Sequence, residues 1–415
     1  MHIYCVFFIL LIFLFYQMKR TNDLAEFYRG CLIGGAIGDA LGYPVEFLSL
    51  EEIKSKYGIW GITDYDLASN GKALISDDTQ MTLFTANGIL NGETQFRYRE
   101  TVMPLVNYVY YAYMDWLTTQ GYQKNVADPS RKDSWLVDVP ELHNRRSPGQ
   151  TCINTLLQRG RDREITLNKP VNDRKGCGAV MRIAPLGLIA HKYGDPFIES
   201  ARIGGITHGH PMSHLSCQLM TLIINNMFKY DDKSLWTIIK DSIRELKYRY
   251  DEPQPYYLRP IYDLTKEYVP EFIKLMKNAL IKVKYVMIQE RRGNLVKDSD
   301  IIASLGQGWV AEEALAIAIY CAVRHNLDPM EGIRAAVNHD GDTDSTGALT
   351  GQILGAFHGL KAFPEEYIKN LELSDVIMEI ADDLAQGCKF SPDDPPSKEK
   401  EKWETKYIHH TRYSK

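Results

Sequence analysis

Apolar residues recur at every third or fourth position over most of the chain between residues 23 and 389. The segment 311–323, AEEALAIAIYCAV, is typical, because this spacing places its apolar side chains on one face of a helix. Long stretches in which apolar and polar residues alternate, as in half-buried strands, are scarce. The pattern therefore predicts a mostly helical protein.

Three regions depart from this pattern and suggest how the chain is organised. Residues 120–149 are polar and contain prolines, and residues 248–300 are rich in Tyr, Lys, Arg and Pro. Residues 391–415 are charged and have few large apolar side chains. We therefore expect one domain over 23–390 with insertions near the first two regions, followed by a charged, loosely attached C-terminal tail.

The N-terminal extension, residues 1–22, contains an uninterrupted apolar run over residues 3–16, followed by Lys19 and Arg20. A membrane-spanning helix needs about 20 apolar residues, and a secretion signal needs a small-residue cleavage site, which does not follow here. Three interpretations stay open. The translation start is placed too early and the protein begins at Met18, or the run is an anchor with a cytoplasmic body, or it directs secretion.

The composition is that of a globular protein, with 415 residues, 45% hydrophobic and 24% charged. These values argue against a disordered, collagen-like or multi-span membrane protein. A net charge of -5 disfavours nucleic acid, or an anionic membrane, as a partner bound through overall charge. The seven cysteines are scattered and form no C-x-x-C pair, which indicates free thiols in a reducing compartment such as the cytoplasm.

Two acidic segments precede helical runs. Residues 76–81, SDDTQM, hold two adjacent carboxylates, and residues 338–347, NHDGDTDSTG, hold three carboxylates that alternate with other residues. Such carboxylates repel unless a cation neutralises them, and with hydroxyls they suit Mg²⁺ or Mn²⁺. A calcium-binding EF-hand loop is excluded, since Gly351 stands where that loop needs Glu. The first segment, taken alone, also fits a helix N-cap.

If the two segments meet, they supply ligands for two divalent cations about 3.5–4 Å apart. Two glycine-rich segments add further candidates. Residues 34–47, GGAIGDALGYPVEF, set Asp39 and Glu46 among apolar residues, where an unpaired charge is costly. Their glycines serve either close helix packing or approach to a ligand. Residues 175–187, KGCGAVMRIAPLG, offer backbone N–H groups to an anion such as phosphate.

Together, these segments resemble the ADP-ribosylglycohydrolase family, which includes the dinitrogenase reductase-activating glycohydrolase and the ADP-ribosylarginine hydrolases. The matching motifs are GCLIGGAIGDALGYPVEF, SDDTQMT, RRSPGQT, KGCGAVMRIAPLGL, THGHP, GWVAEEAL and NHDGDTDSTGALTGQILGA, in the family's order between Tyr28 and about Phe363. The pair SDDT and DGDTDS is specific, and the other motifs support it. The resemblance implies an all-α fold, a compact orthogonal helical bundle with a binuclear Mg²⁺ cleft.

The resemblance also implies individual site residues. The metal ligands of the family match Ser76, Asp77, Asp78, Asp342, Asp344 and Ser345, which would hold two Mg²⁺ ions, or Mn²⁺. The substrate-binding positions match Gly176, Cys177, Gly178 and Ala179, which would cradle a diphosphate, and Thr207 and His208, which would line the same cleft. The catalytic positions match Glu46, Asp77 and Asp78. The general base stays open, because Asp128, Asp133 and Asp138 compete for one role in the 120–149 loop.

We therefore expect Mg²⁺-dependent hydrolysis of the N-glycosidic bond between ADP-ribose and a protein side chain. Arginine is the favoured side chain, since residues 176–182, GCGAVMR, resemble the arginine-directed members. The expected partners are an ADP-ribosylated protein and ADP-ribose in the cytoplasm, with no nucleic acid, and a membrane only if the apolar run is genuine. Two alternatives stay open. One is an immunity-type protein that occludes or counteracts an ADP-ribosyltransferase toxin, and the other is a different two-metal hydrolase of ADP-ribose-like nucleotides.

Overall fold

The computed structural model describes residues 23–99, 102–124, 130–159, 167, 169–193, 196–253 and 259–412. The N-terminal extension and its three interpretations lie outside the described residues. In the described part, no single helix is long and apolar enough to cross a membrane, and only the bent pair Leu24–Val45 and Leu50–Tyr57 passes by length and composition.

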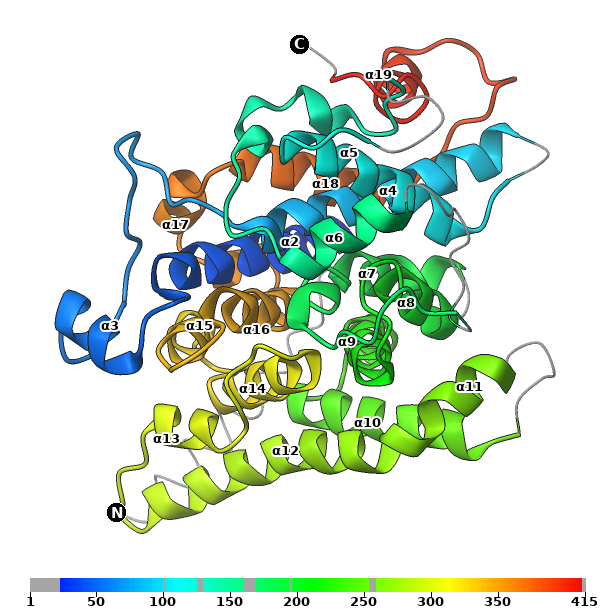
Figure 1. Cartoon of the computed structure of the whole chain (residues 1–415). Coiled ribbons are helices and arrows are strands. Elements are labelled where there is room, and N and C mark those ends of the chain that lie inside the picture. The colour runs from blue at the N-terminus through cyan, green and yellow to red at the C-terminus, as the bar shows by residue number, and fades with distance from the viewer. Residues whose placement is uncertain are drawn as a thin grey trace.

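The described residues form a bundle of helices (Figure 1). In chain order these are α2 (Leu24–Gly42), α3 (Leu50–Tyr57), α4 (Asp77–Tyr98), α5 (Leu105–Thr119), α6 (Gln150–Arg159), α7 (Ala184–Tyr193), α8 (Pro196–Gly204), α9 (Pro211–Lys229), α10 (Leu235–Asp251), α11 (Arg259–Thr265), α12 (Val269–Arg291), α13 (Asp298–Ala303), α14 (Ala311–Arg324), α15 (Pro329–Val337), α16 (Thr343–His358), α17 (Glu365–Asn370), α18 (Ser374–Gln386) and α19 (Lys398–Tyr407). Short 3₁₀ turns include η1 (Tyr43–Val45) and η4 (Cys177–Ala179). The only β pairing among the described residues is two isolated bridges. The all-α prediction is confirmed.

Helices α2 and α16 pack against each other through glycines, near the centre of the bundle (Figure 1). A Cβ atom at Gly34 would lie 2.5 Å from the backbone oxygen of Gly351, and one at Gly347 would lie 2.5 Å from that of Gly38. No side chain fits at such a distance, so these glycines serve close helix packing. The residue numbers of the paired glycines increase along α2 while those of their partners on α16 decrease. The helices are therefore antiparallel, and the C-terminus of α2 meets the N-terminus of α16.

Helix α4 begins at the same place. Asp39, on the last turns of α2, accepts hydrogen bonds from the backbone N–H groups of Ser76 and Thr79 at 3.0 Å. These N–H groups would otherwise lack partners in the first turn of α4. Asp39 is one of the two acids that stand among apolar residues in the sequence, and these hydrogen bonds account for its burial. Asp39 joins α2 to α4 and so gathers three helix ends around one point.

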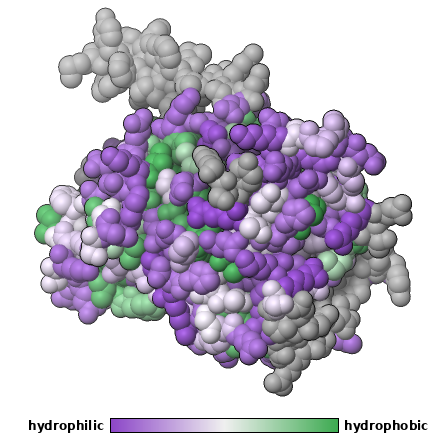
Figure 2. Space-filling model, turned by 90° about the horizontal axis from the view of Figure 1, so that it is seen from above, coloured by the Kyte–Doolittle hydropathy of each residue, from purple (hydrophilic) through white to green (hydrophobic). Residues whose placement is uncertain are grey.

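The region near 248–300, expected to be an insertion, forms much of the outer layer of the bundle. Helix α12 runs along the edge of the molecule in Figure 1 and packs against α10 and α14. Its residues Phe272, Met276, Val283 and Val286 are buried. The face of the molecule in Figure 2 is mostly hydrophilic, with hydrophobic residues gathered in small patches.

The expectation of a loosely attached C-terminal tail was wrong for its described residues. Trp403 and Tyr407 of α19 are buried, and Trp403 Nε1 donates a hydrogen bond to Thr94 Oγ1 at 3.0 Å. The buried Lys406 forms ion pairs with Glu379, at 3.0 Å, and with Asp383. The two aromatic residues stand four positions apart, which puts them on one face of an otherwise charged helix. This narrow stripe was too small to be recognised in the composition.

Candidate active site

The N-terminus of α4 carries the first acidic segment. Ser76 is the N-cap of this helix, and its Oγ accepts a hydrogen bond from the backbone N–H of Asp78 at 3.2 Å. Asp77 Oδ2 accepts a bond from the backbone N–H of Gly149 at 3.0 Å. The buried Asp78 Oδ1 has no hydrogen-bond partner among the described residues. The N-cap interpretation is therefore correct for Ser76, yet it leaves a buried carboxylate oxygen that another ligand could take.

The N-terminus of α16 carries the second acidic segment. Asp342 is the N-cap of this helix, and its Oδ1 accepts a hydrogen bond from the backbone N–H of Ser345 at 3.3 Å. Asp344 Oδ1 accepts a bond from the same N–H at 2.8 Å. The thiol of Cys177 donates a hydrogen bond to Asp342 Oδ2 at 2.7 Å, which joins the glycine loop to this segment. The two acidic segments thus reach one region from opposite parts of the chain.

Glu46 completes the acidic cluster from the segment after α2. Its side chain is buried, and its Oε2 has no hydrogen-bond partner among the described residues. Burial raises the pKa of Glu46 to about 10, and the negative charges of Asp344 and Asp342 add to the rise. Ser147 forms a side-chain hydrogen bond with Glu46. Ser147 has a φ of 45°, which is uncommon for a residue other than glycine and marks a constrained turn.

Burial raises the pKa of every acid in this cluster, and repulsion between the charges adds to the rise for Asp39, Glu46, Asp77, Asp78 and Asp342. Burial is the main cause, and it raises the pKa of Asp39 to about 7. Asp344 is the common neighbour, because its charge raises the pKa values of Asp39, Glu46, Asp77, Asp78 and Asp342. Six carboxyl groups therefore share one buried region in which they cannot all be ionised without a counter-charge.

The chemistry of this cluster fits hard divalent cations, because it offers carboxylate and hydroxyl oxygens, two of which are buried and have no partner within the residues that the structure describes. The positions of these side chains fit a bound cation less well than their chemistry does. Among the described residues, no three His, Cys, Asp or Glu side chains stand around one point at metal-ligand spacing. The ligand assignments and the binuclear cleft therefore stay predictions.

The glycine loop, η4, lies beside this cluster. The backbone N–H of Cys177 donates to the carbonyl oxygen of Trp309 at 3.2 Å, so it does not point freely toward an anion. His208 lies at this loop, because a Cβ at Gly178 would lie 3.1 Å from its imidazole Cε1, and Thr207 Oγ1 is 2.9 Å from His208 Nδ1. Their assignment to substrate binding stays a prediction. Burial, followed by the charge of Arg182, lowers the pKa of His208 to about 3, so its imidazole is neutral at physiological pH.

Arg182 is a site residue that the sequence analysis missed. Its side chain is buried, and Nη2 donates a hydrogen bond to Thr207 Oγ1 at 2.6 Å. The guanidinium lies over the ring of Tyr113, with the two centres 4.4 Å apart. Its positive charge acts to lower the pKa of Asp77. The signal was present in the sequence, since Arg182 is a lone charge in the apolar run AVMRIAPL.

The segment RRSPG also contributes to the site, although the sequence indicated it only as a supporting motif without a role. Arg146 Nη2 binds Glu372 Oε1 at 2.8 Å, and its Nη1 donates to the carbonyl oxygen of Ile75 at 3.1 Å. These contacts fix the segment beside the start of α4. Ser147 and Gly149 of the same segment bind Glu46 and Asp77. The segment therefore closes one side of the acidic cluster.

The aspartates proposed to compete for the role of general base are engaged elsewhere. Asp133 Oδ1 accepts a hydrogen bond from Arg131 Nε at 3.0 Å, and Asp138 forms an ion pair with Lys132. Asp128 lies outside the described residues. The described part of the 120–149 loop therefore gives no support to Asp133 or Asp138 as the general base.

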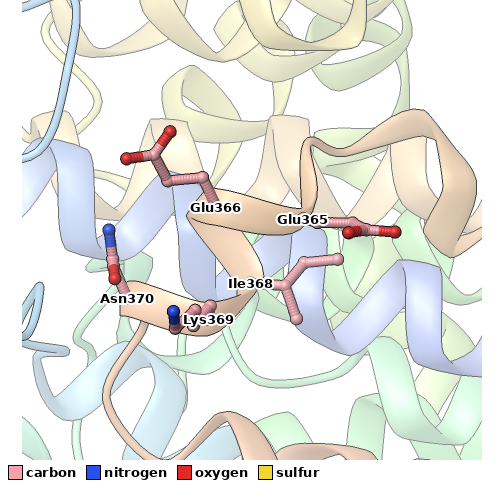
Figure 3. A pocket seen from close by; sticks show the side chains of 5 residues that line it. All are labelled: Glu365, Glu366, Ile368, Lys369 and Asn370. Atoms are coloured by element: carbon pink, nitrogen blue, oxygen red, sulfur yellow. The ribbon is translucent and has the colours of Figure 1, made fainter.

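A surface pocket over α17 is not the candidate site. It is lined by Glu365, Glu366, Ile368, Lys369 and Asn370 (Figure 3). The polar side chains in this view point in different directions rather than toward one point. None of them belongs to the acidic cluster, so this pocket lacks the convergent polar groups of a catalytic site.

Comparisons with known proteins agree with the resemblance. The model of the ADP-ribosylglycohydrolase family matches residues 20–393. The chain is similar to an ADP-ribosylhydrolase, ARH3, of Danio rerio, with 24% identity over 86% of this chain and 89% of the relative. It is also similar to the ADP-ribosylarginine hydrolase Tri1 of Serratia proteamaculans (strain 568), with 23% identity over 86% of this chain and 78% of the relative.

A solved structure shares the fold. It is described as an ADP-ribosylglycohydrolase-related protein complex, and it aligns with a TM-score of 0.53 and 19% identity. The alignment covers 88% of this chain and 98% of that chain. The helical architecture thus agrees with the match to the family.

Proposed function

Because the chain belongs to the ADP-ribosylglycohydrolase family and is a hydrolase of ADP-ribosyl groups, we propose that it removes ADP-ribose from protein arginine in a reaction that needs Mg²⁺. The observation that carries this proposal is the buried cluster of six carboxyl groups from three segments, in which Glu46 and Asp78 each keep an oxygen that has no hydrogen-bond partner in the described part of the chain. Burying this much acid is costly, and a bound cation would offset the cost.

The residues that would hold two Mg²⁺ ions, or Mn²⁺, are those of the two acidic segments, Ser76, Asp77, Asp78, Asp342, Asp344 and Ser345. Bound there, the ions would supply Lewis-acid polarisation and orient the hydroxyl groups of the ribose. The hydroxyls of Ser76 and Ser345 stand at or near the N-caps of α4 and α16, so their backbones are held by helix geometry. The site would thus be preorganised by the packing of α2, α4 and α16.

Glu46 is the acid that we assign to proton transfer. The bond between C1″ of the ribose and the guanidine nitrogen breaks, and water forms a new bond to C1″ and gives up a proton. The leaving nitrogen takes up a proton, so no net proton is consumed. In the metal-free protein the raised pKa of Glu46, caused mainly by burial, keeps its carboxyl protonated at neutral pH, so it has a proton to donate. Ser147 and the burial of the side chain would hold this carboxyl in place.

The arginine preference is supported by the segment GCGAVMR and by the name of the Tri1 relative, an ADP-ribosylarginine hydrolase. The segment places Cys177 against Asp342 and Arg182 beside Thr207, so it adjoins the second acidic segment and a predicted substrate-binding residue. We also propose a cytoplasmic location, which the free state of all six cysteines in the described part of the chain supports.

The test is product analysis with substrates of two linkages. The purified protein is given arginine-linked and serine-linked ADP-ribosyl proteins, each with Mg²⁺ or with a chelator. We expect free ADP-ribose and unmodified protein, a faster rate on the arginine linkage, and no turnover with the chelator. Equal rates on both linkages would contradict the arginine preference. Release of AMP would instead identify a two-metal phosphoesterase.

A further inference from the structure

Two aromatic rings stack at the surface immediately beside the acidic cluster. The ring centres of Phe47 and Trp309 are 5.9 Å apart and the rings are inclined by 16°. The side chain of Phe47 is 72% exposed and that of Trp309 is 39% exposed. Most large aromatic side chains lose water contact on folding, so an exposed, stacked pair calls for an explanation.

Each ring is tied to the acidic cluster through its own backbone. Phe47 directly follows Glu46, whose carboxyl group is buried among the acids. On the other side, a Cβ at Gly308 would lie 3.3 Å from Asp342 Cβ. The carbonyl oxygen of the next residue, Trp309, accepts the backbone N–H of Cys177 at 3.2 Å. The rings therefore come from two separate segments that flank the cluster and meet at the surface beside it.

The position of this pair limits what it can bind. The acids are buried, so only a small part of a substrate, such as a sugar with its leaving group, can reach them. The folded protein that carries the ADP-ribose must stay outside, and its modified side chain must pass from the surface into the cluster. The apolar stem of an arginine and the peptide groups beside it would then run over the exposed rings.

We propose that Phe47 and Trp309 bind the polypeptide segment that carries the modified side chain. This inference rests on the proposed function and assigns the protein-binding part of the same site. Aromatic rings suit this role, since they offer large, rigid contact area and an electron-rich face. The face would also attract a basic residue of the substrate, and the acidic cluster beside it adds to that attraction.

The test compares a protein substrate with a small one. The substrates are an arginine-ADP-ribosylated protein and ADP-ribosylagmatine, which has the same linkage and no polypeptide. We expect Phe47→Ala and Trp309→Ala each to raise the KM for the protein about tenfold, as for an aromatic anchor in an interface. The values of kcat for the protein, and of kcat/KM for ADP-ribosylagmatine, should stay within about threefold of wild type.

The matched control is Phe96→Ala. Phe96 is 73% exposed, and it lies near the end of α4 that is distant from the acids. Nineteen residues separate it from Asp77, which is roughly 28 Å along a helix. This variant should leave both substrates unaffected. Melting temperatures of all variants should match that of wild type, because Phe47 and Trp309 are largely outside the core.

Two results would overturn the inference. Equal losses on both substrates would show that the rings act on ADP-ribose or through Glu46, and no loss on either would show that they do not contact the substrate. A wild-type protein that releases ADP-ribose from neither substrate would refute the proposed function, and the inference would fall with it.

Discussion

Asp342 serves two neighbours at once, since one of its oxygens accepts a hydrogen bond from the backbone of Ser345 and the other accepts one from the thiol of Cys177. Asp78 and Glu46 each keep a buried oxygen without a partner among the described residues. Residues of this kind were predictable, because acids in apolar or helix-starting segments stand out in the sequence. The roles of Arg182, which donates a hydrogen bond to Thr207, and of Ser147, which acts on Glu46, were not, since they depend on contacts between segments distant in the chain.

Replacing Asp342 tests the metal assignment at a single residue. Asp342→Ala should reduce Mg²⁺-dependent turnover at least 100-fold, because it would remove a carboxylate ligand of the cation and also the N-cap side chain of α16. The matched control is Asp340→Ala in the same loop, where the side chain is exposed and accepts the backbone N–H of Leu50 at 2.7 Å. That variant should keep most of its activity. Similar losses in both variants would indicate damage to the loop rather than loss of a ligand.

The pKa shifts predict how stability depends on pH. Asp39 and Glu46 have pKa values raised to about 7 and about 10, above their values of about 4 in an unfolded chain. The metal-free folded state thus binds more protons than the unfolded state across this range. The contribution of these two groups to the stability of the metal-free protein is therefore largest below pH 4. It falls as the pH rises, up to about pH 7 for Asp39 and about pH 10 for Glu46.

Mg²⁺ should compete with these protons. The increase in melting temperature that Mg²⁺ causes should therefore be larger at pH 8 than at pH 6. Histidines and thiols that are buried away from the cluster affect the melting temperatures of the metal-free and the Mg²⁺-bound protein equally. Their effect therefore cancels in the increase that Mg²⁺ causes. Thermal unfolding at the two pH values, with Mg²⁺ and with a chelator, measures it. An increase that is the same at both values would contradict the shared protonation of the cluster.

Among the elements, the helices were predictable because apolar residues repeat at helical spacing, but their partners were not. The glycines of α2 were compatible both with helix packing and with a ligand, and only the contact with α16 decides for packing. The stripe on α19 was overlooked because two aromatic residues in a charged helix barely change its composition. Local patterns define elements, whereas contacts between elements define the site.

A methyl group at the α2–α16 contact should separate these helices. In Gly34→Ala the new Cβ would meet the backbone oxygen of Gly351 at 2.5 Å, and backbone cannot move aside without moving the helix. We expect a loss of about 1–3 kcal/mol or more in unfolding free energy and a loss of activity. In the control, Gly35→Ala, the new atom meets the flexible side chain of Gln352 instead. Equal denaturation midpoints for the two variants would refute the close contact.

At the scale of the whole molecule, the described residues form one core that extends from α2 to α19. The C-terminal segment belongs to this core, contrary to the expectation from its charge, and the region near 248–300 forms part of its outer layer. The chain positions of the acidic segments, 265 residues apart between Asp77 and Asp342, require this whole bundle to fold before the site exists. The sequence could suggest the meeting of these segments only through the family resemblance.

The attachment of α19 is testable with a pair of tryptophans. Trp403→Ala should lower the unfolding free energy by about 3–5 kcal/mol, since it leaves a cavity under α19 and removes the bond to Thr94. Trp60 is 79% exposed, so Trp60→Ala should change the unfolding free energy by no more than about 0.5 kcal/mol. Denaturant titration of both variants gives the comparison. A Trp403→Ala variant as stable as wild type would mean that α19 does not pack as described.

The central claim is that the acidic cluster is a binuclear metal site that supports hydrolysis. The most direct measurement is titration of the metal-free protein with Mn²⁺, followed by electron paramagnetic resonance and, in the same samples, by release of ADP-ribose. We expect two bound Mn²⁺ per chain, magnetic coupling between them, and turnover that rises with occupancy. Asp342→Ala should bind fewer ions, and Asp340→Ala should bind two. Full turnover without bound metal, or binding that Asp342→Ala does not weaken, would contradict the account.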